Sequence, residues 1–308
     1  MPKELSTLVD RKLDRAAVRQ PLDELFTLAR RYKSSKAYSE LIDFIGNFRS
    51  YAPFNAMLVH IQKPGAKFVA PPYRWLSDYH RRVKIEALPL IILQPMGPIM
   101  FVFDVSDTEP EDEEAPLLPL DVERPFEVRR GHLRDELGTT IENAKRDGVS
   151  TAERKDGSLR AGSIEPVKSG QYLNVLVKQR PEKEYVQVPL RYKLILNANH
   201  SIETQYATMA HELAHLYCGH LGTPNETWWP DRRDLSHEIQ EFEAESICYL
   251  VCQRLGIENP SDKYLANYLK DHEAGDVPEI SLERVMTSAG LIEQMGRGRL
   301  KPRKQKVQ

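Results

Sequence analysis

Cysteine is scarce in this chain, which has only three among its 308 residues: Cys218, Cys248 and Cys252. A count this low and odd excludes a small fold held together by a disulfide framework. The first residues are charged and contain no apolar signal core, so we expect a reducing, cytoplasmic compartment. Cys248 and Cys252 lie in an apolar, helix-like stretch, where we expect core packing rather than metal binding or redox chemistry.

Long hydrophobic runs are missing as well. No stretch of apolar residues is long enough to cross a bilayer, so we expect no membrane partner. Hydrophobic residues account for 41% of the chain and charged residues for 29%, which is typical of a soluble globular protein. A chain of this length can form one large domain or two modest ones.

An excess of either charge is also lacking, since the formal net charge is −2, but the charges are unevenly distributed. Residues 1–104 contain sixteen Lys and Arg against ten Asp and Glu, residues 104–114 are strongly acidic, and residues 297–308 carry six basic side chains and no acidic one. Local imbalance of this kind bears on nucleic-acid contact more than the total charge does. A solvated segment is nevertheless the usual meaning of a charge run.

Shifts in composition predict four parts of the chain. We expect a small, mildly basic α+β domain over residues 1–104, an acidic linker with prolines over 105–119, a larger domain over 120–296 and a basic tail over 297–308. The acidic stretch could instead be a long surface loop within one domain.

Hydrophobic periodicity predicts the elements of the two domains. In the first domain we expect helices within residues 3–62 and over 73–82, and strands at 67–70, 88–94 and 99–103. In the second we expect helices at 131–147, 202–218, 234–255, 263–271 and 281–295, and strands at 172–177, 185–188 and 191–196. The last of these strands leads directly into the helix at 202–218.

That helix carries the most informative motif, His211-Glu212-Leu213-Ala214-His215, which reads H-E-x-x-H. Residues four apart on a helix share one face, so His211 and His215 can chelate a single ion. Zinc suits such a site, because it accepts neutral imidazole and tolerates an open coordination position. Glu212 lies between the two ligands and can take the proton of a metal-bound water. The alternative is that the two histidines lie on a solvated face of the helix and bind nothing. The flanking residues are mostly apolar, however, which indicates that the helix is buried, and buried histidines need polar partners.

A catalytic zinc also needs a third protein ligand, and the chain offers several downstream candidates: His220, His237, Glu238, Glu241, Glu243 and Glu245. Glu241 lies on the second long helix, and a glutamate from a following antiparallel helix is the gluzincin geometry. Glu245 shares its face and could accept the free ring N–H of a ligand histidine. Glu243 should point elsewhere, and the roles of His220, His237 and Glu245 stay open. The alternative is that all these glutamates decorate a solvated helix.

Three stretches of the chain, residues 192–197, 208–215 and 241–248, resemble the ImmA/IrrE family of metallo-endopeptidases. The resemblance covers residues 185–255 and implies that His211, His215 and Glu241 bind zinc and that Glu212 is the catalytic base. It also implies an α+β, zincin-like fold of the gluzincin type, with a small antiparallel sheet, for residues 120–296. The implied substrate is a protein or peptide, with a DNA-associated transcriptional repressor as one class.

The N-terminal part resembles the N-terminal domain of ArdC-like antirestriction proteins, on residues 51–58, the helix with Trp75, and Val83-Lys84 with the following hairpin. This resemblance implies binding of single-stranded DNA. Cations for phosphates alternate here with rings for base stacking: Lys63, Lys67, Arg74, Arg81, Arg82 and Lys84 with Phe68, Tyr73, Trp75 and Tyr79. The alternative is that the rings form the core and the cations solubilise the domain.

The sequence therefore predicts a zinc-dependent endopeptidase that hydrolyses peptide bonds with activated water. One rival is a single-stranded-DNA-binding antirestriction-type protein whose zinc site is structural or regulatory, and another is a metal-sensing regulator without turnover. Trp228 and Trp229, in the loop between the two ligand helices, could wall a substrate cleft or plug the core beneath the loop, and the second role is favoured.

Overall fold

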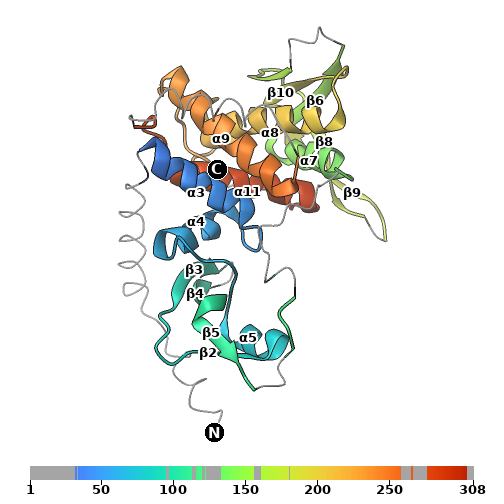
Figure 1. Ribbon diagram of the computed structural model, residues 1–308. Helices are drawn as coiled ribbons and strands as arrows, with labels where there is room; N and C mark the ends of the chain where they lie inside the picture. The colour runs from blue at the N-terminus through green and yellow to red at the C-terminus, as the bar shows by residue number, and fades with distance from the viewer. Residues whose placement is uncertain are drawn as a thin grey trace. The chain divides into compact units, whose positions relative to one another are not determined.

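The computed structural model describes residues 32, 34–94, 97–112, 116–119, 122, 133–155, 161–179, 181–257, 265 and 276–303. The chain divides into two compact units, Met1–Glu127 (unit 1) and Val128–Gln308 (unit 2), each with helices and small sheets (Figure 1). The predicted helical region before residue 32 and the predicted helix at 263–271, apart from Leu265, lie outside the described residues.

The described helices of unit 1 are α3 (Ser35–Asn47), α4 (Pro53–Gln62) and α5 (Pro72–Tyr79). Each begins where the sequence favours a start. The Ser34 side chain accepts a hydrogen bond from the Ala37 backbone N–H, and proline occupies the first helical position of α4 and α5. The prediction extended α5 to Arg82, but the helix ends at Tyr79, because His80 has a left-handed φ of 51° and Arg81 already belongs to a strand.

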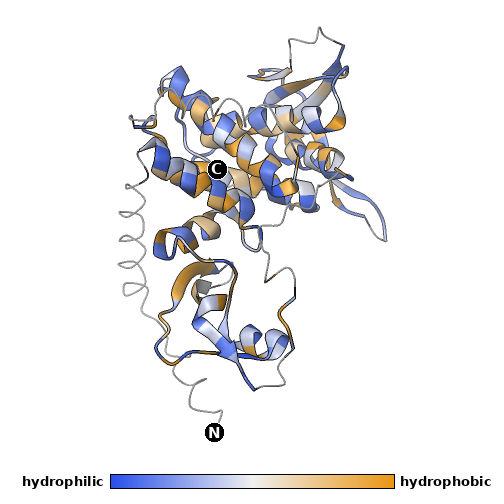
Figure 2. Cartoon of the chain, in the orientation of Figure 1, coloured by the Kyte–Doolittle hydropathy of each residue, from blue (hydrophilic) through white to orange (hydrophobic). Residues whose placement is uncertain are grey.

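Three antiparallel strands form the larger sheet of unit 1, in the order β1 (Val69–Ala70), β4 (Gly97–Asp104) and β3 (Leu90–Gln94). The hairpin of β3 and β4 is confirmed, and β3 is among the most hydrophobic parts of unit 1 (Figure 2). Two side chains of α4 bind the backbone of β3. Asn55 exchanges two hydrogen bonds with Leu93, and Gln62 exchanges two with Ile91. These amides satisfy groups that an edge strand would otherwise leave open.

A second pairing in unit 1 changes the expected domain boundary. Strand β2 (Arg81–Val83) pairs antiparallel with β5 (Thr108–Pro110), which follows the 3-10 helix η1 (Val105–Asp107). Val122 then joins the buried cluster of Phe68, Ala70 and Trp75. The stretch predicted as a linker over 105–119 thus contains a paired strand of unit 1, and the division falls after Glu127. The acidic composition of this stretch gave no sign of a strand. The strand forms because it pairs with β2, which lies far away in sequence.

The described helices of unit 2 are α7 (Glu136–Ala144), the 3-10 helix η2 (Lys145–Asp147), α8 (Ile202–Cys218), α9 (His237–Leu255) and α11 (Leu282–Arg297). Helices α8, α9 and α11 pack against one another (Figure 1). Both α8 and α9 have complete caps. Ser201 and Ser236 accept N-cap hydrogen bonds, and Gly219 and Gly256 close the C-termini in the left-handed conformation. The predicted bounds of α8 are confirmed.

The sheet beside α8 has the order β6 (Val149–Arg154), β10 (Tyr192–Asn197) and β7 (Gly162–Pro166). Strand β10 runs antiparallel to β7 but parallel to β6, so the predicted antiparallel sheet is in fact mixed. A separate antiparallel pair consists of β8 (Tyr172–Lys178) and β9 (Glu184–Pro189). The sequence did not predict β6 and β7, because most of their side chains are exposed or half-buried and carry no hydrophobic alternation.

Hydrophobic side chains of unit 2 gather where its three long helices meet. Hydrophobic and hydrophilic residues alternate along α8 and α9 (Figure 2), and α9 buries residues on several sides. Its buried side chains include Phe242, Ile247, Leu250 and Val251, as well as the charged Glu243. None of the helices in the described part of the chain is both long enough and apolar enough to cross a membrane.

Candidate metal centre

Helix α8 presents His211 and His215 on one face. Their Nε2 atoms lie 3.2 Å apart, and the ring centroids are 4.9 Å apart. The spacing follows from the helix, since residues four apart are stacked one turn above the other. The His211 side chain is 20% exposed and the His215 side chain 13% exposed, so both can be reached from solvent while packed against protein.

Helix α9 brings the carboxylate of Glu241 to the same point. Its Oε1 lies 3.4 Å from His215 Nε2, and its Oε2 lies 3.7 Å from His211 Nε2. One donor atom from each of the three side chains lies within 4.8 Å of the others. The structure therefore brings together the three residues that the sequence predicts as ligands, and the packing of α8 on α9 accomplishes this.

The chemistry of these donors fits a divalent cation. Burial, reinforced by the neighbouring rings of His211 and His220, lowers the pKa of His215 to about 3. The imidazole is therefore neutral at ordinary pH, which is the form that binds metal. Two imidazoles and a carboxylate constitute a donor set that zinc accepts while keeping a further position open.

Glu212 lies half-buried on α8, next to the edge of β7. Burial raises the pKa of its carboxyl above the ordinary value, although His211 and a hydrogen bond from the Ile164 backbone partly oppose the shift. The close approach of β7 requires a glycine at its start, because a Cβ on Gly162 would lie 2.7 Å from Thr208 Cγ2 of α8. A carboxylate with a raised pKa is better able to accept and hold a proton.

Two other residues that the sequence left open also lie near the donors. Glu245 Oε1 is 3.6 Å from His211 Nδ1, on the side of the ring away from Nε2. His237 Nδ1 is 3.6 Å from Glu241 Oε1, but its side chain is 85% exposed. Glu245 thus faces His211, as its helical spacing predicts, and His237 lies at the surface.

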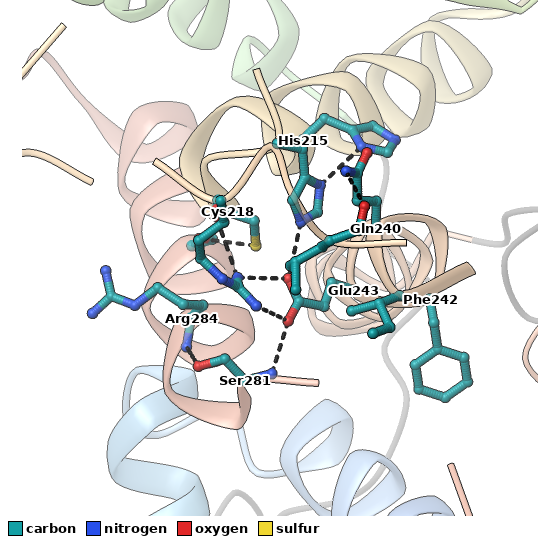
Figure 3. A network of polar contacts seen from close by, with 12 residues as sticks. His215, Cys218, Gln240, Phe242, Glu243, Ser281 and Arg284 are labelled. Carbon is teal, nitrogen blue, oxygen red and sulfur yellow. Dashed lines mark hydrogen bonds and ion pairs between the residues drawn. The ribbon is translucent and has the colours of Figure 1, made fainter. Parts of the chain in front are cut away.

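Behind His215 lies a buried polar chain that the sequence did not predict. His220 Nδ1 is 3.0 Å from His215 Nδ1, and His220 Nε2 is 3.0 Å from Glu243 Oε2. Glu243 also accepts two hydrogen bonds from Arg232, at 2.8 and 2.7 Å, and one from the Ser281 backbone N–H at 2.7 Å (Figure 3). Burial alone would raise the pKa of Glu243, but these partners lower it to about 2.

Glu243 points away from the donor atoms, as the helical spacing predicts, yet it is fully buried rather than surface-exposed. One sequence signal could have identified it. Glu243 is flanked by Phe242 and Ala244 in an apolar helix, and a buried carboxylate requires partners.

Cys218, His220 and Glu243 form a second group of closely spaced donor atoms. This group does not suit a cation, because the Arg232 guanidinium already neutralises Glu243 and also donates to the Cys218 carbonyl at 3.3 Å. Burial raises the pKa of the Cys218 thiol, so that it stays protonated, whereas metal binding needs the thiolate. The core role expected of Cys248 and Cys252 is confirmed, since both side chains are buried and neither forms a disulfide.

The two tryptophans of the loop between α8 and α9 have different surroundings. Trp229 is buried, and its Nε1–H donates to the Gly222 carbonyl at 2.9 Å, which confirms the favoured prediction that it plugs the core. Trp228 is half-buried, with the guanidinium carbons of Arg191 and Arg303 each 5.5 Å from its ring centroid. Both tryptophans therefore hold the loop in place.

In unit 1 the structure revises the predicted alternation of cations and rings. Trp75 and Phe68 are buried in the core, and the Trp75 indole N–H donates to the Phe103 carbonyl. Of the cations, Lys63 pairs with Asp107, and Arg82 pairs with Glu111. The alternative, that rings form the core, is therefore right for Trp75, whose burial leaves no face for a base, whereas the buried Phe68 also lines a cavity.

An aromatic cavity of about 580 Å³ nevertheless opens in unit 1. Tyr51, Tyr73, Tyr79 and Arg74 are among its lining residues. The Tyr73 side chain is 68% exposed, so that, unlike Trp75, it offers an accessible ring.

Comparison with known proteins was made by sequence and by structure. Residues 171–252 match the model of the family Peptidase_M78, described as the IrrE N-terminal-like domain. Two crystal structures of the antirestriction ArdC protein from plasmid R388 are similar over 80% of this chain, with 14% sequence identity. The metal-free one is covered to 82% with a TM-score of 0.33, and the Mn(II)-bound one to 83% with a TM-score of 0.35. No curated protein matches the sequence.

The family match begins just before β8 and ends within α9. It therefore contains both histidines of the motif, the glutamate between them and Glu241. The part of this chain that supplies all three donor side chains is the part that matches the IrrE N-terminal-like family.

Proposed function

We propose that this protein is a zinc-dependent endopeptidase of the ImmA/IrrE type, with a zincin-like fold of the gluzincin type in unit 2. The observation that carries the proposal is the convergence of His211, His215 and Glu241 from two packed helices, with Glu212 beside them. The match of residues 171–252 to the Peptidase_M78 family supports it independently.

In this proposal His211, His215 and Glu241 hold the zinc ion. When bound, the ion supplies Lewis-acid polarisation of the scissile carbonyl and makes water acidic enough to lose a proton at neutral pH. Glu212 accepts that proton, because its raised pKa favours the protonated form more than an exposed glutamate would. The same carboxyl then delivers the proton to the leaving amine. The partly exposed side chains of the donors leave room for a peptide to reach them.

The proposed substrate is a protein or peptide. The resemblance to ImmA/IrrE enzymes favours a DNA-associated regulator, such as a transcriptional repressor, as the substrate class. Such a target would place the enzyme in the cytoplasm, as the sequence predicts.

Replacing Glu212 with Gln tests the proposal. The variant should bind zinc as tightly as the wild type, because the three donors are unchanged, yet lose at least about 100-fold in hydrolysis, since general base catalysis contributes about that much. Zinc content can be measured by atomic emission and hydrolysis with a degenerate library of internally quenched peptides. Undiminished cleavage by the zinc-loaded variant would show that Glu212 is not the catalytic base. A wild type that binds no zinc would show that the three donors do not form a zinc site.

A second candidate function, binding of single-stranded DNA, rests on the aromatic cavity of unit 1. Tyr51, Tyr73 and Tyr79 offer ring faces, and Arg74 offers a cation, around a space of about 580 Å³. Stacking on aromatic rings near a cation is how proteins bind single strands without sequence preference. In this alternative, zinc in unit 2 would be structural or regulatory.

Binding of a fluorescent single-stranded oligonucleotide, followed by anisotropy, separates this candidate from the first. Tyr73→Ala should weaken binding by about 5- to 150-fold if a base stacks there, which corresponds to roughly 1–3 kcal/mol per base. Leu76→Ala is the matched control, since Leu76 is also exposed on α5 but does not line the cavity. Equal losses in both variants, or no binding by the wild type, would argue against a nucleic-acid site.

A further inference from the structure

We propose that His220 and Glu243 form a positioning chain that fixes the tautomer and orientation of His215. This inference rests on the proposed metal centre, and it concerns residues that lie behind the donors rather than among them. It follows from four contacts, taken in order from Glu243 to the Nε2 atom of His215.

The Glu243 end of the chain is an acceptor. Its carboxylate receives two hydrogen bonds from the Arg232 guanidinium and one from the Ser281 backbone N–H, all between 2.7 and 2.8 Å. An arginine fork of this kind matches an ionised carboxylate. Glu243 therefore accepts the fourth hydrogen bond too, and its donor, His220 Nε2 at 3.0 Å, must carry a proton.

The proton on Nε2 determines the state of the other ring nitrogen of His220, Nδ1. A neutral imidazole carries one ring proton, so with Nε2 protonated its Nδ1 is a bare acceptor. Within the described part of the chain, the ring nitrogen that lies within hydrogen-bond distance of His220 Nδ1 is His215 Nδ1, at 3.0 Å, which must therefore donate. The His220 side chain is 1% exposed and that of Glu243 fully buried, so bulk water does not compete for these contacts.

His215 is then left with its proton on Nδ1 and a free lone pair on Nε2. Nε2 is the atom that faces His211 Nε2 at 3.2 Å and Glu241 Oε1 at 3.4 Å. The chain thus selects the one neutral tautomer that can bind a metal in that place, and the Nδ1 hydrogen bond also restrains rotation of the ring.

The second ligand histidine is held differently. His211 Nδ1 lies 3.6 Å from Glu245 Oε1, which is longer than a hydrogen bond, and both side chains are about one-fifth exposed. The two histidines of the motif therefore differ in preorganisation: His215 is fixed before any ion arrives, and His211 is not.

Direct observation of the His215 tautomer tests the inference without any metal. In metal-free wild-type protein, long-range ¹H–¹⁵N correlation spectra should show the His215 ring protonated at Nδ1 and bare at Nε2, and the His220 ring protonated at Nε2. A His215 ring protonated at Nε2 would overturn the proposal, whether or not the protein binds zinc.

Two substitutions of His220 test its consequence for affinity. His220→Leu removes the acceptor and should weaken zinc binding by about 10- to 100-fold, the usual effect of losing such a partner. His220→Gln should retain most of the affinity, because its carbonyl oxygen can accept from His215 while its amide donates to Glu243. Zinc affinity is measured by competition with a chromophoric chelator, using zinc alone as the probe.

Tyr217→Phe is the matched control for stability. Tyr217 lies on α8, as His215 does, and donates a buried hydrogen bond to Asp147 Oδ2 at 2.8 Å. Its loss should destabilise unit 2 without changing the His215 tautomer or zinc affinity, which separates positioning from general stability. Wild-type affinity in His220→Leu would overturn the proposal. If that variant does not fold, a His220→Gln protein that folds but has lost the Nδ1 proton of His215 would overturn it instead.

These outcomes also distinguish the positioning chain from the proposed function. If the wild type shows the expected tautomer but binds no zinc, the proposed metal centre is wrong and the hydrogen-bonded chain still stands. If the wild type binds zinc but His215 has the opposite tautomer, the metal centre stands and the positioning chain is wrong.

Discussion

Three glutamates of α9 at alternate positions have three different surroundings. Glu241 faces the histidine pair, and Glu245 lies one turn further on, next to His211. Helical spacing alone predicted that these two share a face. Glu243 lies between them in sequence but is buried and surrounded by Arg232, Ser281 and His220. Its partners come from the loop before α9 and from the start of α11. No local sequence pattern predicts contacts with residues so far away.

The buried carboxylate of Asp104 in unit 1 predicts how acid acts on that unit. Burial alone would raise the pKa of Asp104, but hydrogen bonds from the Ser106 hydroxyl and from the backbone N–H groups of Lys67, Ser106 and Phe68 lower it below the ordinary value. Because the pKa of Asp104 is lower in the folded state than in the unfolded state, the ionised carboxylate stabilises the folded unit. This stabilisation is fully present when the pH is above the unfolded-state pKa of about 4. This stabilisation is lost as the pH falls through the folded pKa.

We therefore expect the free energy of unfolding of unit 1 to fall more steeply between about pH 5 and pH 2 in the wild type than in Asp104→Asn. The Trp75 indole N–H resonance, one of three from tryptophan in the chain, reports on unit 1 during urea unfolding at each pH. Parallel curves for the two proteins would show that Asp104 does not govern this response. Glu86→Gln is a suitable control, because Glu86 is exposed on the surface of the same unit.

At the scale of elements, the ends of α8 were predictable and the strands around β10 were not. Ser201 and Gly219 are local signals that begin and end a helix through contacts within a few residues. Strands β6 and β7 exist because β10 lies between them and pairs with both. Their own residues are mostly polar, so the pairing, rather than the local sequence, makes them strands.

Gly219 predicts how sensitive the end of α8 is to substitution. Its φ is +86°, and a Cβ would lie 2.0 Å from the Pro230 carbonyl oxygen, a backbone atom that cannot easily move. Gly222 has a similar φ of +79°, but a Cβ there would meet only the Arg233 side chain at 3.0 Å. Gly222→Ala should cost about 1–2 kcal/mol for the left-handed conformation, and Gly219→Ala distinctly more.

The difference between the two alanine variants isolates the backbone contact, because both carry the same conformational cost. Urea unfolding, followed by circular dichroism, measures the free energy of unfolding of each variant. Equal destabilisation would mean that the loop after α8 shifts to accept the methyl group and that Pro230 does not determine where α8 ends.

At the scale of the whole molecule, the chain has two compact units, and all three proposed zinc ligands belong to the second. Binding of an ion to folded unit 2 should therefore stabilise that unit. At a free zinc concentration about 100 times the dissociation constant, the expected gain is about 2.7 kcal/mol.

Zinc titration during urea unfolding checks this expectation. The indole signals of Trp228 and Trp229 report on unit 2, and that of Trp75 reports on unit 1. Zinc should shift the first two to higher urea, and a His211→Ala, His215→Ala double variant should abolish the shift. A zinc-dependent shift that persists in the double variant would place the binding site elsewhere.

The linear order of residues was enough to predict the helix with the H-E-x-x-H motif, its two neighbouring histidines and the glutamate between them, because helical spacing and capping act over a few residues. Glu241 was one of several downstream candidates for a third ligand, and the resemblance to the ImmA/IrrE family, rather than spacing alone, singled it out. The mixed sheet, the paired strand inside the acidic stretch, the burial of Trp75 and the chain from Glu243 through His220 to His215 all needed the folded chain. Each of these joins groups far apart in sequence, and only the packing of helices and the pairing of strands bring such groups within reach.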